Sequence, residues 1–297
     1  MLGSPDVEAV LAWSAGRRDE LPWRQTRDPW SVLVSELMLQ QTQVARVVPR
    51  WYQFLDRFPT AAVCAQAPVG DVVTEWAGLG YNRRAVNLHR TAVAVVAQHG
   101  GVVPDDLDAL LALPGLGPYT ARALLAFAYE RDVAVVDTNV GRILARQRGE
   151  RLTARVAQTF ADDIVPIGTG WSWNQGLLDL GALVCTKRSP HCEACPTAMT
   201  CSWFRGGSLE PDPAIGSAAV SKGQSKFIGS FREGRARLLD VLRTGIEVAP
   251  EQFRDACGWN ERDGGELDAV RAADSLVRDG LAIAGCDGSL SLPRTQG

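Results

Sequence analysis

Four cysteines lie close together in the spacing Cys185-x6-Cys192-x2-Cys195-x5-Cys201. Four thiolates in one short segment can hold a zinc ion or a [4Fe–4S] cluster. Zinc ribbons usually pair two Cys-x2-Cys units, whereas this segment contains one, and the spacing also differs from that of ferredoxins. We therefore expect a metal site here. The other three cysteines, at positions 64, 257 and 286, are expected to be ordinary buried residues.

Two carboxylates have neighbours that suit them to acid–base chemistry. Glu36 stands among Val34, Leu37 and Met38, so partial burial would raise its pKa and suit it to donate a proton. The alternative is a glutamate on the surface of a helix. Asp137 follows an apolar run and precedes the helical pattern VGRILAR, which predicts an N-cap. A carboxylate in that position is expected to stay ionised and can stabilise a cation.

Two further segments have residue types that suit nucleic acid. Gln40, Gln41 and Thr42 are uncharged hydrogen-bonding residues, which suit base edges or the gap left by an extruded base. The segment LPGLGPYTA at 113–121 resembles the turn of a helix-hairpin-helix element, in which Gly115 and Gly117 allow the backbone to approach a phosphate. The alternative for this second segment is a glycine turn between packed helices.

The hydrophobic pattern predicts that the chain up to about residue 130 is helical. The expected helices are 7–14, one starting at Asp28-Pro29, 44–57, 69–77, 83–98 and 105–112. Residues 205–226 are rich in Gly, Ser and Pro, which predicts a linker. Residues 227–297 should then form a small α+β, winged-helix-like domain, with helices over 235–243, 249–256 and 267–278 and a terminal β-hairpin.

The composition limits the class of protein. The 297 residues are 46% hydrophobic, which excludes global disorder, and the net charge of −3 excludes a strongly basic nucleic-acid-binding chain. There is no signal-peptide pattern at the start and no apolar run long enough for a membrane span. We expect a cytoplasmic, nucleoid-associated protein that has no contact with membranes.

Several motifs occur in an order that is specific to one family: LPWR (21–24), SELMLQQTQV (35–44), GLGY (78–81), LPGLGPYTA (113–121), VDTNV (136–140) and WNQGLLDLGALVC (173–185). With the cysteine spacing, they resemble the bacterial A/G-specific adenine DNA glycosylases of the helix-hairpin-helix, endonuclease III superfamily. The likeness covers about residues 18–204. It implies a mostly α helix-hairpin-helix glycosylase domain over 1–204, with a [4Fe–4S] loop at 185–201 and metal ligands Cys185, Cys192, Cys195 and Cys201.

The resemblance also implies roles for individual residues. Glu36 matches the acid that protonates adenine N7, and Asp137 matches the carboxylate that stabilises the oxocarbenium ion. Tyr119 and Asn139 match residues that support these two. The positions that match DNA-contacting residues are Trp23, Arg24 and Asp179 in the adenine pocket, Leu39, Gln41 and Tyr81 in the duplex, and Lys187 and Arg188 at phosphates. The family often has glutamate where this chain has Asp179.

The implied reaction is removal of adenine from A:8-oxoguanine and A:G mismatches by a monomer acting on double-stranded DNA. Tyr119 stands where endonuclease III has its Schiff-base lysine, and a tyrosine cannot form an imine, so we expect no efficient strand cleavage. Two alternatives remain. One is a thymine or uracil mismatch glycosylase of the same superfamily, and the other is a non-catalytic, cluster-bearing DNA-binding protein.

The tail departs from the family pattern. Many adenine glycosylases have a large C-terminal domain that reads 8-oxoguanine, but about 75 residues follow the linker here and they lack its strand blocks. Four arginines gather at the first expected helix of the tail: Arg232, Arg235, Arg237 and Arg243. We expect them to contact phosphates and thereby strengthen duplex binding, with limited contact to the opposite strand. The alternative is a small stabilising appendage.

Overall fold

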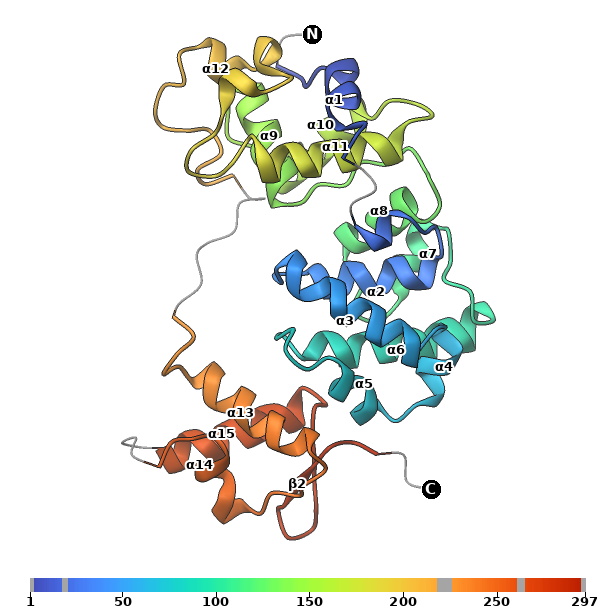
Figure 1. The fold of residues 1–297 in the computed structure, drawn as a ribbon, viewed down its shortest axis with the longest axis vertical. Helices are drawn as coiled ribbons and strands as arrows, with labels where there is room; N and C mark the ends of the chain where they lie inside the picture. The colour runs from blue at the N-terminus through green and yellow to red at the C-terminus, as the bar shows by residue number, and fades with distance from the viewer. Residues whose placement is uncertain (1–2, 18–20, 218–225, 261–264, 295–297) are drawn as a thin grey trace. The chain divides into compact units, whose positions relative to one another are not determined.

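The structure is a computed structural model, and it describes residues 3–17, 21–217, 226–260 and 265–294 (Figure 1). The described part is mostly helical, as predicted. The helices of the first half are α1 (Val7–Ser14), η1 (Pro22–Arg24), α2 (Pro29–Leu39), α3 (Val44–Arg57), α4 (Ala61–Gln66), α5 (Val69–Glu75), α6 (Arg83–His99), α7 (Leu107–Ala112) and α8 (Pro118–Phe127). Those that follow are α9 (Thr138–Arg148), α10 (Ala154–Ile164), α11 (Gly170–Leu183), η2 (Cys192–Ala194), η3 (Ala198–Thr200) and α12 (Ser202–Arg205).

Local signals explain where several helices begin. The Asp28 carboxylate accepts the Ser31 N–H at 2.8 Å ahead of Pro29, the first residue of α2. Asp106 accepts the Ala109 N–H at 2.9 Å, which starts α7 two residues later than the sequence predicted. The prediction missed α4, whose short run AAVCAQ is too brief to show a helical period.

Contacts divide the described residues into two compact units. One unit takes its described residues from Met1–Val32, Asp105–Leu111 and Leu116–Gly223. Its core is formed where α9 packs against α10 and α11, and α1 packs against α11. The largest buried side chains there are Trp173, Ile143, Leu144 and Leu177. This unit contains Asp137, at the start of α9.

The other unit takes its described residues from Leu33–Pro104, Ala112–Gly115 and Gln224–Gly297. Within it, α6 packs against α4 and α5, and Phe54, Trp76 and Leu88 are fully buried. The described part of the tail belongs to this unit, and α13 (Phe231–Arg243) contacts α5. This unit contains Glu36, in the second half of α2.

The tail has the helices and the hairpin that the sequence predicted. After α13 come η4 (Pro250–Gln252), α14 (Phe253–Ala256), α15 (Gly265–Arg278), β1 (Ile283–Ala284) and β2 (Leu290–Ser291). The two strands are antiparallel, with Ala284 opposite Leu290, and Val248 forms a further bridge to Leu290. A helix, a bridge strand, two helices and a hairpin are the element order of a winged helix. Membership of that class, and the domain boundaries at 204 and 226, stay predictions.

The predicted linker is only partly within the described residues. Positions 218–225 lie outside them. Before that gap, Asp212, Ala214 and Ser217 are buried, and the Ser217 hydroxyl accepts the Leu152 N–H at 3.2 Å. Composition alone did not indicate this packing, because it depends on partners about 65 residues away. None of the helices in the described ranges has the length and apolar character needed to span a membrane.

Candidate active site and cysteine centre

Asp137 is the N-cap of α9, as the sequence predicted. Its Oδ1 accepts the N–H groups of Asn139 at 2.8 Å and Val140 at 2.7 Å. The segment before it is held by Asn174, whose side chain accepts the Val135 N–H and donates to the Val133 carbonyl, both at 2.8 Å. The carboxylate therefore has a fixed orientation at the positive end of an eleven-residue helix.

The pKa of Asp137 results from opposing effects. Burial raises the pKa of this carboxyl above its ordinary value, and this is the largest effect. The N–H groups of Val140 and Asn139 and the charge of Arg142 lower it. The expectation of a carboxylate held ionised by the helix end rests on these lowering effects and leaves out the burial that opposes them.

Arg142 connects the start of α9 to the cysteine segment. Its guanidinium donates to Asn139 Oδ1 at 2.9 Å, to the Gly181 carbonyl at 2.6 Å and to the Cys185 carbonyl at 2.6 Å. Gly181 allows this approach, because a Cβ there would lie 2.5 Å from the Asn139 Cβ. Asn139, Arg142 and Gly181 also line one groove together with Lys187. Arg188 is exposed and is not part of that lining.

Arg24 and Asp179 form a bidentate ion pair. Arg24 Nη1 and Nη2 donate to the two carboxylate oxygens at 3.0 and 2.7 Å, and the side chains are 7% and 15% exposed. The shorter aspartate side chain therefore reaches Arg24 where the family often has glutamate. Trp23, the preceding residue in η1, is buried, and Tyr119 is half-buried in the first turn of α8.

Glu36 is buried in α2 with a relative exposure of 6%. Its neighbours Val34, Leu37 and Met38 are all at or below 1% exposure. The alternative of a glutamate on the helix surface is therefore wrong. The burial that the sequence suggested for a proton-donating carboxyl is present.

The loops that follow α2 and α5 are held by one buried arginine. Arg84 Nη1 donates to the carbonyls that close α2, those of Leu37, Met38 and Gln40, at 2.6, 2.9 and 2.7 Å. Its Nη2 donates to the Thr42 hydroxyl at 3.0 Å and to the carbonyls of Leu79 and Gly80 at 3.2 and 2.9 Å. Burial lowers the pKa of Arg84 to about 10, which leaves it charged at neutral pH.

These loops hold two residues in the left-handed region, which is unfavourable for residues other than glycine. Gln41 has a φ of 56° and Tyr81 a φ of 46°. Both residues line a groove with Gln40, while Leu39 is half-buried at the end of α2. The loops therefore carry Gln41 and Tyr81, which are predicted to enter the duplex, in unfavourable backbone conformations that the surrounding structure must stabilise.

The predicted hairpin lies between α7 and α8. Gly115 has a φ of 80°, and a Cβ there would lie 2.6 Å from the Asn87 Cβ, so only glycine fits. Thr91 donates to the Pro114 carbonyl at 2.6 Å and anchors the turn. Gly117 is the N-cap of α8 and is followed by Pro118, so the first N–H groups of α8 have no side-chain cap.

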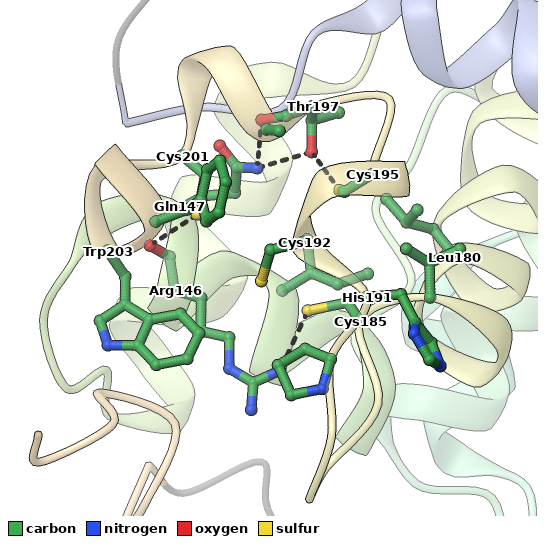
Figure 2. A pocket seen from close by; sticks show the side chains of 15 residues that line it. Arg146, Gln147, Leu180, Cys185, His191, Cys192, Cys195, Thr197, Cys201 and Trp203 are labelled. Atoms are coloured by element: carbon green, nitrogen blue, oxygen red, sulfur yellow. Dashed lines mark hydrogen bonds between the residues drawn. The ribbon is translucent and has the colours of Figure 1, made fainter. Parts of the chain in front are cut away.

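The four clustered cysteines line one cavity (Figure 2). Arg146 donates to the Cys185 sulfur at 3.3 Å, and the Cys195 sulfur lies 3.4 Å from the Thr197 hydroxyl. Among the described residues, no three metal-binding side chains converge on a point suited to one ion.

The remaining cysteines only partly match expectation. Cys64 and Cys257 are buried, as predicted, whereas Cys286 is exposed, so that prediction is wrong. Cys286 lies in the turn between β1 and β2, where the chain leaves the core.

Comparisons with known proteins identify the family. The model of the HhH-GPD superfamily of base excision DNA repair proteins matches residues 34–162. The adenine DNA glycosylase of Mycolicibacterium smegmatis is 39% identical over 288 residues, which cover 95% of this chain and 94% of that protein. The adenine DNA glycosylase of Mycobacterium tuberculosis is 40% identical, over 96% and 92% of the two chains. The chain belongs to the adenine DNA glycosylases of this superfamily.

Two solved structures share the fold of this glycosylase over about two thirds of the chain. A thermostable thymine-DNA glycosylase matches with a TM-score of 0.62 at 29% identity, over 67% of this chain and 95% of that one. Endonuclease III, trapped in a covalent complex with DNA, matches with a TM-score of 0.61 at 21% identity, which supports the fold alone. The reading as a non-catalytic DNA-binding protein is excluded by the family, whose members are enzymes that cleave N-glycosyl bonds.

The sequence analysis missed the arginines of this glycosylase that connect its predicted site residues. Arg142 and Arg84 were not singled out, although each bonds to residues that were. One signal was available for the first of them. Arg142 lies three residues after Asn139 in α9, so helical spacing alone places it beside a predicted site residue.

Proposed function

We propose that this glycosylase flips adenine out of A:8-oxoguanine and A:G mismatches and hydrolyses its N-glycosidic bond. One observation carries the proposal. Glu36 is a buried carboxyl in α2, while Asp137 is a carboxyl that accepts two N–H groups at a helix N-terminus. Two carboxyls in such different environments suit a reaction that needs one carboxyl protonated and the other ionised.

The chemistry assigned to the two groups follows from their surroundings. Glu36 donates a proton to N7 of adenine, so that the base leaves as a neutral group with the electron pair of the glycosidic bond. Asp137, in its ionised form, stabilises the positive charge that develops on the sugar. Water then completes the hydrolysis. The hydrogen bonds from Asn139 and Val140 lower the pKa of Asp137 and so oppose the effect of burial.

Recognition of the substrate is assigned to two groups of residues. Trp23, with the Arg24–Asp179 ion pair, would line the pocket for the extruded adenine. Leu39, Gln40, Gln41, Thr42 and Tyr81 would occupy the space that the base leaves in the stack. A monomer would bind the DNA backbone through the hairpin that contains Gly115 and Gly117 and through Lys187 and Arg188.

The cysteine cavity would hold a [4Fe–4S] cluster. Cys185, Cys192, Cys195 and Cys201 supply the four thiolates that such a cluster needs, and Arg146 places a positive charge beside them. When bound, the cluster joins the four ligands and so fixes the loop that carries Lys187 and Arg188. Iron content near four per chain would support this. Stoichiometric zinc without iron, in protein purified anaerobically, would contradict it.

We further propose that the enzyme leaves the DNA strand intact, because Tyr119 offers no amine to attack the sugar. The alternative with specific support is a thymine or uracil glycosylase. An enzyme of that name from Methanothermobacter thermautotrophicus is 33% identical to this chain, but over only 67% of it. Protonation of N7 is a purine requirement, so a buried Glu36 favours adenine.

One assay separates these possibilities. Duplexes with adenine opposite 8-oxoguanine, guanine, cytosine or thymine, and one with thymine opposite guanine, are incubated with excess enzyme. We expect free adenine from the first two, no thymine, and a strand that breaks only after alkali. Release of thymine from the guanine mismatch without release of adenine would favour the alternative.

A further inference from the structure

Arg243, the last residue of α13, is directed into the protein rather than toward solvent. Its side chain is 9% exposed. The guanidinium donates to the Val73 carbonyl at 3.1 Å, to Asn82 Oδ1 at 2.8 Å and to Asp240 Oδ1 at 2.6 Å. The expectation that Arg243 contacts phosphates is therefore wrong, because its donors already have protein partners.

A second tail arginine is also bonded within the protein. Arg235 donates to the Ser275 hydroxyl and to Asp279 Oδ2, both at 2.6 Å. Arg237 pairs instead with Glu233 at 2.8 Å, one turn earlier on the exposed face of α13. The tail therefore does not present all four arginines as one phosphate-binding surface.

The acceptor Asn82 lies next to the strained Tyr81. Tyr81 keeps a φ of 46°, which is costly for a bulky residue unless its neighbours hold it. On one side, Arg84 holds the carbonyls of Leu79 and Gly80. On the other side, Asn82 is 8% exposed and its side-chain oxygen is held by Arg243.

The tail is joined to the same region at a second point. The Gly70 N–H, at the start of α5, donates to the Pro293 carbonyl at 2.8 Å. A Cβ on Gly70 would lie 2.6 Å from that oxygen, so the two backbones are in direct contact. Both ends of α5 therefore contact the tail. In addition, Arg235 and Asp279 of the tail line the same groove as Gln41 and Tyr81.

We propose that the C-terminal segment positions Tyr81 for entry into the duplex, and that Arg243 is the positioning residue that does so through Asn82. This inference rests on the proposed role of Tyr81 beside the extruded base. In this proposal the tail affects DNA binding through the loop after α5. The arginines of α13 do not themselves form the contact to phosphate.

The test uses the full chain and four single variants: Arg243→Ala, Asn82→Ala, Tyr81→Ala and the control Arg271→Ala, which removes an exposed ion pair with Asp268 elsewhere in the tail. The probe is a mismatch duplex with a non-hydrolysable adenosine analogue and 2-aminopurine as the neighbouring base, whose fluorescence reports unstacking. We expect Arg243→Ala and Asn82→Ala to weaken binding about tenfold, the loss typical of one hydrogen bond to a charged group. The fluorescence change at saturating protein should also fall in these two variants, and Arg271→Ala should match the wild type.

A double variant separates positioning from general stability. If Arg243 acts through Tyr81, then Arg243→Ala combined with Tyr81→Ala should bind no more weakly than Tyr81→Ala alone. Additive losses, or a normal fluorescence amplitude in Arg243→Ala and Asn82→Ala, would overturn the inference. If Arg243→Ala fails to fold, Asn82→Ala and its double variant with Tyr81→Ala decide by the same criteria. A Tyr81→Ala enzyme that binds and unstacks normally would instead contradict the proposed role of Tyr81.

Discussion

Arg142 donates a hydrogen bond to Asn139 Oδ1 at 2.9 Å, and the same guanidinium reaches the carbonyl of Cys185, the first of the clustered cysteines. Asn139 in turn donates its backbone N–H to Asp137. A short chain of contacts thus leads from the cysteine segment to the carboxylate assigned to the sugar cation. The residues in this chain of contacts come from α9 and from the segment that follows α11. The geometry of Asp137 therefore depends on both of these segments.

Replacing Arg142 should therefore impair excision. In Arg142→Ala, Asn139 loses its partner and the carbonyls of Gly181 and Cys185 lose their buried donor. We expect the single-turnover rate of adenine release to fall about 10- to 100-fold, the scale seen when a group that orients functional residues is removed. Arg148→Ala is the matched control, because Arg148 lies on the same helix and pairs with Glu150 at the surface. Equal rates in the two variants would contradict this role for Arg142.

The raised pKa of Asp137 has consequences for pH. In the proposed mechanism excision needs the ionised form of Asp137. The rate should therefore fall as the pH drops through the folded-state pKa, which lies above the ordinary value for aspartate of about 3.9. A raised pKa also means that the folded state binds the proton more tightly than the unfolded state. The associated stability is present below the unfolded pKa and is lost as the pH rises through the folded pKa.

Asp137→Asn should therefore be inactive but more stable than the wild type at neutral pH, since asparagine can still cap the helix and carries no buried charge. The measurement is denaturant unfolding at pH 7, with Asp6→Asn as the control, because Asp6 caps α1 from an exposed position. A loss of stability in Asp137→Asn would show that the charge is favourable there.

The Arg24–Asp179 pair should contribute more to stability than a surface pair of the same geometry. Asp179→Asn leaves a buried guanidinium without its counter-charge, and we expect the free energy of unfolding to fall by about 3 kcal/mol. Asp162→Asn breaks another bidentate pair, in which Arg122 is the partner and the carboxylate is 37% exposed. There we expect a loss of at most about 1 kcal/mol. Similar losses at both sites, measured by urea unfolding, would contradict the distinction.

Tyr119 offers a test of the reaction outcome. Tyr119→Lys introduces an amine in the first turn of α8, at the position that the sequence resemblance matches to the Schiff-base lysine of endonuclease III. We expect the variant to form a covalent complex with DNA on borohydride reduction, and the wild type to form almost none. Tyr119→Phe serves as the control, since it keeps the ring and adds no amine. Trapping of the wild type at the level of the lysine variant would contradict the reading of an enzyme that leaves the strand intact.

Local patterns predicted the parts of the site that depend on neighbours in sequence. The burial of Glu36 follows from Val34, Leu37 and Met38, and the capping by Asp137 follows from the helix that begins one residue later. The positions of Arg84, Arg142 and Arg243 depend instead on carbonyl and amide groups that lie about 40 to 170 residues away in the chain. The hydrophobic period of a sequence gives no information about such distant partners. For this reason the sequence alone assigns the tail arginines to DNA, although Arg243 bonds to the protein.

The most direct test of the proposed chemistry is single-turnover excision by Glu36→Gln on a duplex with adenine opposite 8-oxoguanine. Glutamine keeps the shape of the side chain but cannot donate the acid proton, so binding should remain within about threefold of the wild type. Adenine release should fall by at least about 100-fold, the lower end of the usual contribution of general acid catalysis. Excision by Glu36→Gln at a rate close to that of the wild type would contradict the assignment of Glu36 as the proton donor.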